Sequence, residues 1–213
     1  MNEKRVYTFG NGQAEGNASM REVLGGKGAN LAEMNHIGVP VPPGFTITTD
    51  TCNEYYKVGQ EKIVELLTDE VNAAVAHTEA LMNCKFGDPK NPLLVSVRSG
   101  ARASMPGMMD TILNLGLNDE VAAGMVEKTG NPHFVYDSYR RFVQMYGDVV
   151  LGMKPENKED IDPFEAIIEK VKEEQGVVLD KDLSVESLKK LVELFKKAIK
   201  EQTGSDFPTD PKE

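Results

Sequence analysis

The amino-acid sequence predicts an α+β protein, because short β-type runs alternate with helical stretches in its first half and helices fill its second half. Apolar residues spaced three and four apart predict the helices, and short alternating or β-branched runs predict the strands. The expected strands cover residues 6–9, 45–49, 93–97 and 111–115. The expected helices cover residues 26–37, 50–58, 61–82, 131–150, 162–175 and 184–202.

The length and composition of the chain set its expected organisation. Its 213 residues, 40% of them hydrophobic, are enough for one large or two small domains with a buried core. We expect an α+β subdomain over residues 1–115 and a mostly helical subdomain over residues 116–202. Residues 203–213, rich in Pro, Asp and Gly, are expected to form an exposed connector.

The chain is acidic, and most of the acidity lies in its second half. The formal net charge is −10, of which −3 belongs to residues 1–115 and −7 to residues 116–213. Because a nucleic-acid partner needs a dense basic face, we expect none. No apolar run is long enough for a membrane span, and residues 1–10 lack the apolar core of a targeting signal. We therefore expect a cytoplasmic protein with no membrane partner.

The first segment that indicates chemistry is a glycine cluster, Leu24-Gly25-Gly26-Lys27-Gly28-Ala29-Asn30-Leu31. A helix is expected to begin near Lys27, which would place a cation and free N–H groups at a helix start and so form an anion site. A tight turn with a solvent-exposed lysine fits the cluster equally well. It is not a Walker A loop, because Gly28 follows the lysine where that motif requires Ser or Thr. The apolar residues that continue the helix are Leu31, Met34 and Ile37.

The second such segment is Ser96 to Thr111, with the sequence SVRSGARASMPGMMDT. Between Leu93 and Met109 the only charged side chains are Arg98 and Arg102. Glycine and small residues let a ligand approach the main chain, and guanidinium groups add charge-assisted hydrogen bonds, an arrangement that suits phosphate oxygens. The alternative is that each arginine pairs with a carboxylate distant in sequence.

Within this segment, Met105 to Met109 is expected to form a turn. Pro106 fixes φ, and Gly107 supplies a conformation that other residues resist. The turn could cover a ligand, or the three methionines could pack against the edge of a core. Because residues 111–115 alternate and predict a strand that returns to the sheet, we expect the loop to be held between two strands.

The second half is expected to be almost entirely helical. Asp162 predicts a helix start, with Pro163 at the first position and Glu165 completing a capping box, and Gly176 predicts its end. In the helix before it, one face holds Val135, Tyr139, Phe142, Val143, Tyr146, Val149 and Val150. In the last helix the inward face holds Leu188, Leu191, Val192, Phe195, Ala198 and Ile199. The lysines expected to point largely outward are Lys189, Lys190, Lys196, Lys197 and Lys200.

Several of these segments together resemble the N-terminal part of the pyruvate, phosphate dikinase family. The resemblance is carried by residues 17–21 (NASMR), 24–34 (LGGKGANLAEM) and, above all, 96–111. It continues through residues 129–132 and 136–142, and more loosely to the end of the chain. The related phosphoenolpyruvate synthases share the Val-Arg-Ser core but, as a family, lack the Ala-Ser-Met-Pro-Gly-Met-Met continuation that this chain has.

The resemblance implies an ATP-grasp nucleotide-binding domain, in which two lobes close on Mg-ATP. Such enzymes convert ATP, orthophosphate and pyruvate reversibly to AMP, pyrophosphate and phosphoenolpyruvate, and a histidine on a separate swivelling domain carries the phosphoryl group. This chain would be one lobe with a helical insert. It would bind ATP phosphates without catalysing the full reaction.

The resemblance also implies roles for particular residues. Lys27 matches the family's lysine at the ATP phosphates, and Arg98 matches an arginine at the transferring phosphates, so both are expected to be catalytic. Arg140 and Arg141 fall at a family arginine pair, of which Arg141 is assigned to the nucleotide. The other expected contacts lie in or just after the loop that would cover the phosphates: Arg102, Ser104, Met105, Gly107 and Thr111.

Other parts of such an enzyme are missing from this sequence. The histidines His36, His77 and His133 lie in helical surroundings without the context of a phosphorylated histidine, and we expect structural or exposed roles for them. Asp110 is the acid nearest the loops, but the Mg²⁺ ligands are expected on a missing second ATP-grasp lobe. The expected partners are that lobe, a phosphohistidine domain and a pyruvate-binding domain, in a parent enzyme that is a homo-oligomer.

Two alternatives stay open at this point. The chain could be the ATP-binding domain of a phosphoenolpyruvate synthase-like enzyme or of another dikinase. It could also be a non-catalytic module whose acidic helical half docks a protein partner. Nucleotide binding that depends on Arg98 would favour the dikinase, because a scaffold has no reason to prefer a triphosphate.

Overall fold

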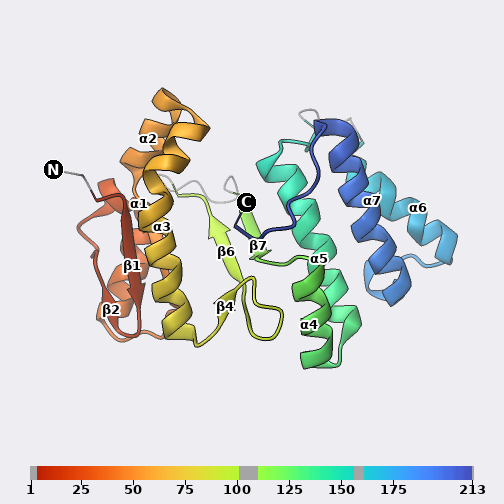
Figure 1. The fold of residues 1–213 in the computed structure, drawn as a ribbon, viewed down its shortest axis with the longest axis horizontal. Helices are drawn as coiled ribbons and strands as arrows, with labels where there is room; N and C mark the ends of the chain where they lie inside the picture. The colour runs from red at the N-terminus through yellow and green to blue at the C-terminus, as the bar shows by residue number, and fades with distance from the viewer. Residues whose placement is uncertain (1–3, 101–109, 156–160, 213) are drawn as a thin grey trace. The chain divides into compact units, whose positions relative to one another are not determined.

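The structure, a computed structural model, describes residues 4–100, 110–155 and 161–212 and contains two compact units (Figure 1). The first unit contains the described residues up to Cys84, together with Ser99 and Gly100. The second contains Lys85–Arg98 and the described residues from Asp110 onwards. Both hold helices and small sheets, so the expected α+β class is confirmed. The expected subdomain boundary at residue 115 stays a prediction.

The first unit is built on a three-stranded antiparallel sheet of order β2-β1-β3. Strand β1 spans Val6–Gly10, β2 spans Gln13–Ala14 and β3 spans Gly44–Ile47. A two-residue turn joins β1 to β2, with Asn11 at φ 51° and Gly12 at φ 74°. Asn and Gly adopt this left-handed conformation at low cost, which makes a tight hairpin possible.

The first unit also contains three helices, namely α1 (Arg21–His36), α2 (Thr49–Val58) and α3 (Gln60–Met82). Helices α1 and α3 pack on the strands, and α2 packs on both helices. The Glu70 carboxylate of α3 accepts hydrogen bonds from the main-chain N–H groups of Arg5 and Val6, at 2.9 and 3.0 Å. The helix thereby fixes the start of the central strand.

The buried face of α1 is made mainly of small residues. The apolar residues Ile37 and Met34, which indicated the helix in the sequence, are 67% and 38% exposed. The helix lies close enough to the strands that small side chains fit there, and the larger ones at positions 34 and 37 point away. The buried residues of α1 are Leu24, Gly25, Gly28, Ala29, Ala32 and Asn35.

The second unit contains two small sheets, one parallel and one antiparallel. In the first, β4 (Lys85–Phe86) pairs with β5 (Pro92–Leu93), and in the second, β6 (Val95–Arg98) pairs with β7 (Thr111–Leu115). The single strand expected over residues 93–97 is therefore wrong, because the chain leaves one sheet after Leu93 and enters the other at Val95. The strand expected over residues 111–115 is confirmed.

Four α-helices and a 3₁₀ turn, η2 (Asp180–Asp182), complete the second unit. The helices are α4 (Asp119–Thr129), α5 (Pro132–Met145), α6 (Pro163–Gln175) and α7 (Val185–Thr203). Each begins after a capping residue whose side chain accepts a hydrogen bond from a main-chain N–H of the first turn; these residues are Asn118, Asn131, Asp162 and Ser184 respectively. None of the described helices is long and apolar enough to cross a membrane.

The core of the second unit lies among α5, α6, α7 and the hairpin β6–β7. Phe164 and Phe195 are fully buried, with ring centroids 4.8 Å apart at 68°, and burying each side chain is worth about 2–3 kcal/mol. The inward stripe expected for α7 is confirmed. One lysine departs from expectation, because the Lys196 side chain is only 18% exposed and its Nζ lies 5.1 Å from the centroid of the Tyr139 ring.

Helix α5 continues into a π-helical turn, η1 (Tyr146–Val150). A π turn holds more residues than an α turn, so the residues at its end are rotated away from the apolar stripe. Val149 and Val150, expected to be buried, are 37% and 52% exposed, and that part of the expectation was wrong. The stripe residues before the π turn are buried as expected, namely Val135, Tyr139, Phe142 and Val143.

The π turn also places the Asp148 carboxyl group in a half-buried position. Its Oδ1 atom is buried with no hydrogen-bond partner among the described residues. Burial and the nearby carboxylates of Asp162 and Glu165 raise the pKa of Asp148 to about 6, although Lys154 opposes them. At neutral pH the turn therefore holds an unfavourable charge.

The segment after α7 is not exposed throughout. Most of its described side chains are exposed, as expected, but Phe207 is only 7% exposed. Its ring meets the rings of Phe142 and Tyr146 edge to face, with centroids 5.8 and 5.2 Å away. The expectation of an exposed connector was therefore wrong at Phe207, which belongs to the core of the second unit.

We expect Asp148→Asn to stabilise the chain at pH 7 by about 1 kcal/mol, a value reduced for the solvent exposure of the group. The pKa of Asp148 is about 6 in the folded chain against an ordinary 3.8. Its protonation therefore favours folding fully below about pH 4, and this contribution is lost as the pH rises through about 6. Urea unfolding of the wild type and the variant between pH 4 and 8 measures the difference.

The matched control is Asp69→Asn, which removes an exposed carboxylate from α3. The stability gain of Asp148→Asn should shrink towards zero at pH 4, whereas the control should show no such dependence. A gain that stays constant from pH 4 to pH 8 would contradict the assignment.

Candidate functional site

Helix α1 is broken at Gly25. This residue has φ 68° and ψ 171°, so one helical segment stops before it and a second begins at Gly26. Only glycine adopts such a backbone without strain. Lys27 therefore lies in the first turn of the second segment, where main-chain N–H groups have no helical acceptor one turn earlier. The helix start expected near Lys27 is confirmed.

The glycine that follows the lysine allows this segment to approach β3. A Cβ atom built on Gly28 would lie 2.7 Å from Thr46 Cγ2 and 2.9 Å from Thr46 Oγ1, distances that real Cβ atoms do not reach. A Cβ atom on Gly26 would meet nothing within 4 Å. The two glycines thus have different roles, and Gly28 is the one that the packing of α1 requires.

The Lys27 ammonium group contacts the second segment that the sequence singles out. Its Nζ atom donates a hydrogen bond to the main-chain oxygen of Ser99 at 3.0 Å, across 72 residues of sequence. Within the described part of the chain this is its only polar contact, and no carboxylate pairs with it. The glycine cluster therefore meets the residue that follows Arg98, a contact that neither motif predicts by itself.

Arg98 is the last residue of β6, and Thr111 is the first residue of β7. They are partners in the antiparallel register of β6 and β7, so the segment between them begins and ends at one place, as expected. Arg98 is exposed, and no described carboxylate lies in ion-pair contact with it. The alternative in which Arg98 is neutralised by a distant acid is thus not found among the residues that the structure describes.

An irregularity in β7 orients this hairpin. The register shifts between the pairs Val95–Leu115 and Val97–Ile112, and Asn114 has φ 61°. The extra residue is a β-bulge, which lets Ile112 and Leu115 both pack on the core although they are three residues apart. The bulge thus supports the strand that carries Thr111.

Four of the expected phosphate contacts fall outside the described residues. These are Arg102, Ser104, Met105 and Gly107. They remain predictions from the resemblance.

The arginine pair on α5 is divided between two environments. The Arg140 side chain is 3% exposed, and its guanidinium group donates to Asp137 Oδ1 at 2.7 Å and to Asp180 Oδ2 at 3.2 Å. The Arg141 side chain is 60% exposed and donates to Asp137 Oδ2 at 3.0 Å. Asp137 thus pairs with both arginines, which lie three and four residues after it, the spacing typical of ion pairs along one helix.

The second carboxylate of this network is ionised in the folded chain. Burial alone would raise the pKa of Asp180, but the hydrogen bond from Lys172 and the charges of Arg140 and Lys172 lower it overall. Arg140 therefore has a structural role as the buried member of a charged network. The Arg141 side chain is largely exposed and is therefore the member of the pair that is accessible from solvent.

The histidines occupy places that fit structural or exposed roles. His36 Nε2 lies 2.9 Å from the Gly16 carbonyl oxygen, and His133 Nε2 lies 2.9 Å from that of Leu183. His77 is exposed on α3. Within the described ranges, no three His, Cys, Asp or Glu side chains gather into a group that could hold a metal ion.

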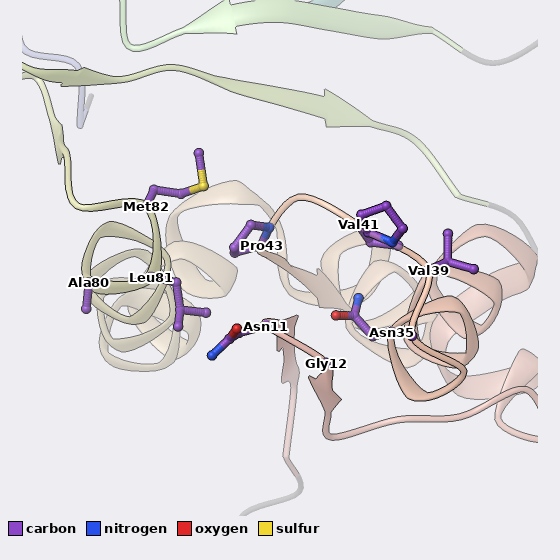
Figure 2. Close-up of a pocket in the computed structure, with 11 residues that line it drawn as sticks. Asn11, Gly12, Asn35, Val39, Val41, Pro43, Ala80, Leu81 and Met82 are labelled. Carbon is purple, nitrogen blue, oxygen red and sulfur yellow. The ribbon is translucent and has the colours of Figure 1, made fainter.

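A separate pocket of about 540 Å³ lies in the first unit, at the end of α1 opposite Lys27 (Figure 2). It is lined by Asn35 and the loop after α1, by the β1–β2 turn and by the last turn of α3. Its polar side chains are those of Asn11 and Asn35, and none of its lining residues is charged. The pocket contains none of the expected phosphate contacts.

Comparison with known proteins places the chain among nucleotide-binding domains. Residues 21–207 match the family described as pyruvate phosphate dikinase, AMP/ATP-binding domain. The pyruvate, phosphate dikinase of Clostridium symbiosum is 55% identical over 211 residues, which is 99% of this chain and 23% of the relative. The chloroplastic enzyme of Flaveria trinervia is 52% identical over 210 residues, again 99% of this chain and 21% of the relative.

A further bacterial relative agrees with these two. The pyruvate, phosphate dikinase of Rhizobium meliloti is 50% identical over 208 residues, which is 98% of this chain and 22% of the relative. The chain therefore spans about a fifth of the length of these relatives.

We expect Gly28→Ala to destabilise the chain by about 1–3 kcal/mol, because the new methyl group overlaps Thr46. Gly26→Ala is the matched control and should be neutral or slightly stabilising, because the site is open and alanine favours helix. Thermal unfolding of both variants measures the effect. Adding Thr46→Ala should restore part of the stability of Gly28→Ala, and a double variant that is no more stable than the sum of the single changes would count against the steric explanation.

We expect Arg140→Ala to cost about 2–3 kcal/mol, because it removes a buried side chain together with its charge-assisted hydrogen bonds to two partly exposed carboxylates. Arg141→Ala should change stability by no more than about 0.5 kcal/mol, because the pair it breaks is largely exposed. Urea unfolding of the two variants measures the difference. Equal losses in both variants would show that the two arginines share one structural role.

Proposed function

The chain belongs to the family of pyruvate phosphate dikinase AMP/ATP-binding domains, and we propose that it binds the phosphate groups of ATP through Lys27 and Arg98. The observation that carries this proposal is the position of Lys27. Its ammonium group has no described carboxylate partner, lies in the first turn of a helical segment and contacts the loop that follows Arg98.

The electrostatics of α1 support an anionic ligand. A helix start carries a partial positive charge, and a lysine adds a full one, so an unliganded site of this kind is unfavourable. Such a site becomes favourable when phosphate oxygens accept hydrogen bonds from both the main chain and the ammonium group. Arg98 adds planar N–H donors that suit phosphate geometry.

We propose the corresponding reaction for the whole enzyme of which this chain is a part. It is the reversible conversion of ATP, orthophosphate and pyruvate to AMP, pyrophosphate and phosphoenolpyruvate, with the phosphoryl group carried by a histidine on another domain. Phosphoryl transfer depends on positioning and on neutralising the charge of the transferring group. Lys27 and Arg98 would supply that charge, and losing one such contact commonly costs about 3 kcal/mol of transition-state stabilisation.

The remaining parts of the proposal concern groups beyond these two cations. We propose an ATP-grasp arrangement in which this chain is one lobe, with Arg102, Ser104, Met105, Gly107 and Thr111 contacting the phosphates. A second lobe, a phosphohistidine domain and a pyruvate-binding domain would complete a cytoplasmic homo-oligomer. Mg²⁺ would neutralise phosphate charge when bound, and because the described residues hold no cluster of metal ligands, its ligands are proposed on the second lobe.

Arg141 is proposed as a weaker contact to the nucleotide. Its guanidinium group is exposed but already shares the Asp137 carboxylate with Arg140. A phosphate group would therefore have to compete with, or join, that ion pair. This is why we expect its removal to reduce ATP affinity less than the removal of Arg98.

The direct test is a calorimetric titration of the chain with ATP, with and without Mg²⁺. We expect saturable binding in the wild type and a loss of at least about tenfold in affinity for Arg98→Ala and for Lys27→Ala, because each removes a charge-assisted contact to phosphate. Lys57→Ala, which removes an exposed cation from α2, is the control and should bind as the wild type does.

The outcomes separate the alternatives. Equal binding of ATP by all four proteins would contradict the assignment of Lys27 and Arg98. If the wild type itself shows no binding, the same variants must be tested in the complete enzyme by single-turnover phosphorylation. There, wild-type rates in Arg98→Ala or Lys27→Ala would refute the assignment.

A further inference from the structure

We propose that the main-chain carbonyl of Ser99 is a positioning group for Lys27, which holds the ammonium group in place before any phosphate arrives. This inference rests on the proposed function and deepens it. The carbonyl oxygen of Ser99 would orient the cation. A ligand that binds Lys27 would therefore also affect Ser99.

The hydrogen-bonding capacity of lysine supports this role. An ammonium group has three N–H donors, and one of them points at the Ser99 oxygen at 3.0 Å. The other two have no acceptor among the described residues. A carbonyl oxygen is neutral overall, so it orients the ammonium group without neutralising it. A carboxylate at the same place would compete with phosphate.

The location of Lys27 explains why such a group is needed. The lysine is exposed and has a flexible four-carbon stem, whose ordering costs up to about 2 kcal/mol of rotamer entropy. It also lies at the positive end of the helical segment that begins at Gly26, which repels the ammonium group towards solvent. A single acceptor across from it opposes both effects.

The same hydrogen bond joins Lys27 to the residue next to Arg98 in the sequence. Ser99 directly follows Arg98, so the contact restrains the main chain one residue beyond that arginine. A polyphosphate that holds Lys27 would also steady Ser99. Conversely, weakening the Ser99 acceptor should weaken phosphate binding at Lys27 although no side chain has changed.

The experiment changes the carbonyl itself. Replacing Gly100 by glycolic acid converts the Ser99 carbonyl from an amide to an ester, which is a weaker acceptor, and the site has no atom within 4 Å of a Cβ position. The same replacement at Gly12, in the β1–β2 turn, is the matched control. The probe is inorganic tripolyphosphate, and the two readouts are its affinity by calorimetry and the ¹⁵N signal of the Lys27 ammonium group.

The expected result has two parts. Without ligand, the Lys27 ammonium signal should be visible in the wild type and in the Gly12 control, and should be broadened by exchange with water in the Gly100 ester. With tripolyphosphate, the Gly100 ester should bind about fivefold more weakly than the wild type, a typical effect for weakening one hydrogen bond to a charged group. Lys27→Arg identifies the signal by removing it, and should retain part of the affinity because guanidinium can reach the same acceptor.

The role of Ser99 and the proposed phosphate binding can fail separately, and the experiment distinguishes the two failures. An unchanged ammonium signal in the Gly100 ester would overturn the role of Ser99 whether or not tripolyphosphate binds. A wild-type chain that shows the ammonium signal, loses it in the ester and yet binds no tripolyphosphate would uphold the positioning of Lys27 and count against the proposed function.

Discussion

The arrangement around Lys27 depends on the left-handed backbone of Gly25. Without that break, α1 would be continuous, and Lys27 would lie in mid-helix with its N–H groups bonded to the preceding turn. The break creates a new helix start within the element and exposes polar main-chain groups where the lysine lies. Gly28 then lets the restarted segment approach β3 closely enough to be held there. Gly25 supplies the backbone conformation that breaks the helix, and Gly28 allows the close packing that positions the restarted segment.

Arg98, the candidate site residue of the second unit, is positioned by side-chain packing. The hairpin β6–β7 is short, and an isolated hairpin of this kind is marginally stable. It is held by the helical core, because the bulge at Asn114 directs Ile112 and Leu115 to the same side. Arg98 and Thr111 therefore lie at the end of a supported hairpin where its connecting segment begins and ends. In this unit packing against the helices positions the two strand ends, whereas in the first unit a backbone conformation positions Lys27.

The sequence predicted much of the fold, and the failures have identifiable physical causes. Helix starts at Asp162 and Ser184 could be predicted because caps are local. The exposure of Val150 could not, because a π turn changes the helical phase without a sequence signature. The contact between Lys27 and Ser99 was also out of reach, since it joins residues far apart in the chain. Motifs predicted that both segments bind phosphate, but only the tertiary structure shows which atoms meet.

The shared carboxylate of Asp137 has a consequence for how this domain can change during evolution. One of its oxygens anchors the buried Arg140, and the other restrains the exposed Arg141. A substitution at that single position would therefore alter both the stability of the fold and the exposed charge of Arg141. Natural selection could not adjust one property there without affecting the other. Variation should instead accumulate at neighbouring positions that serve only one of the two arginines.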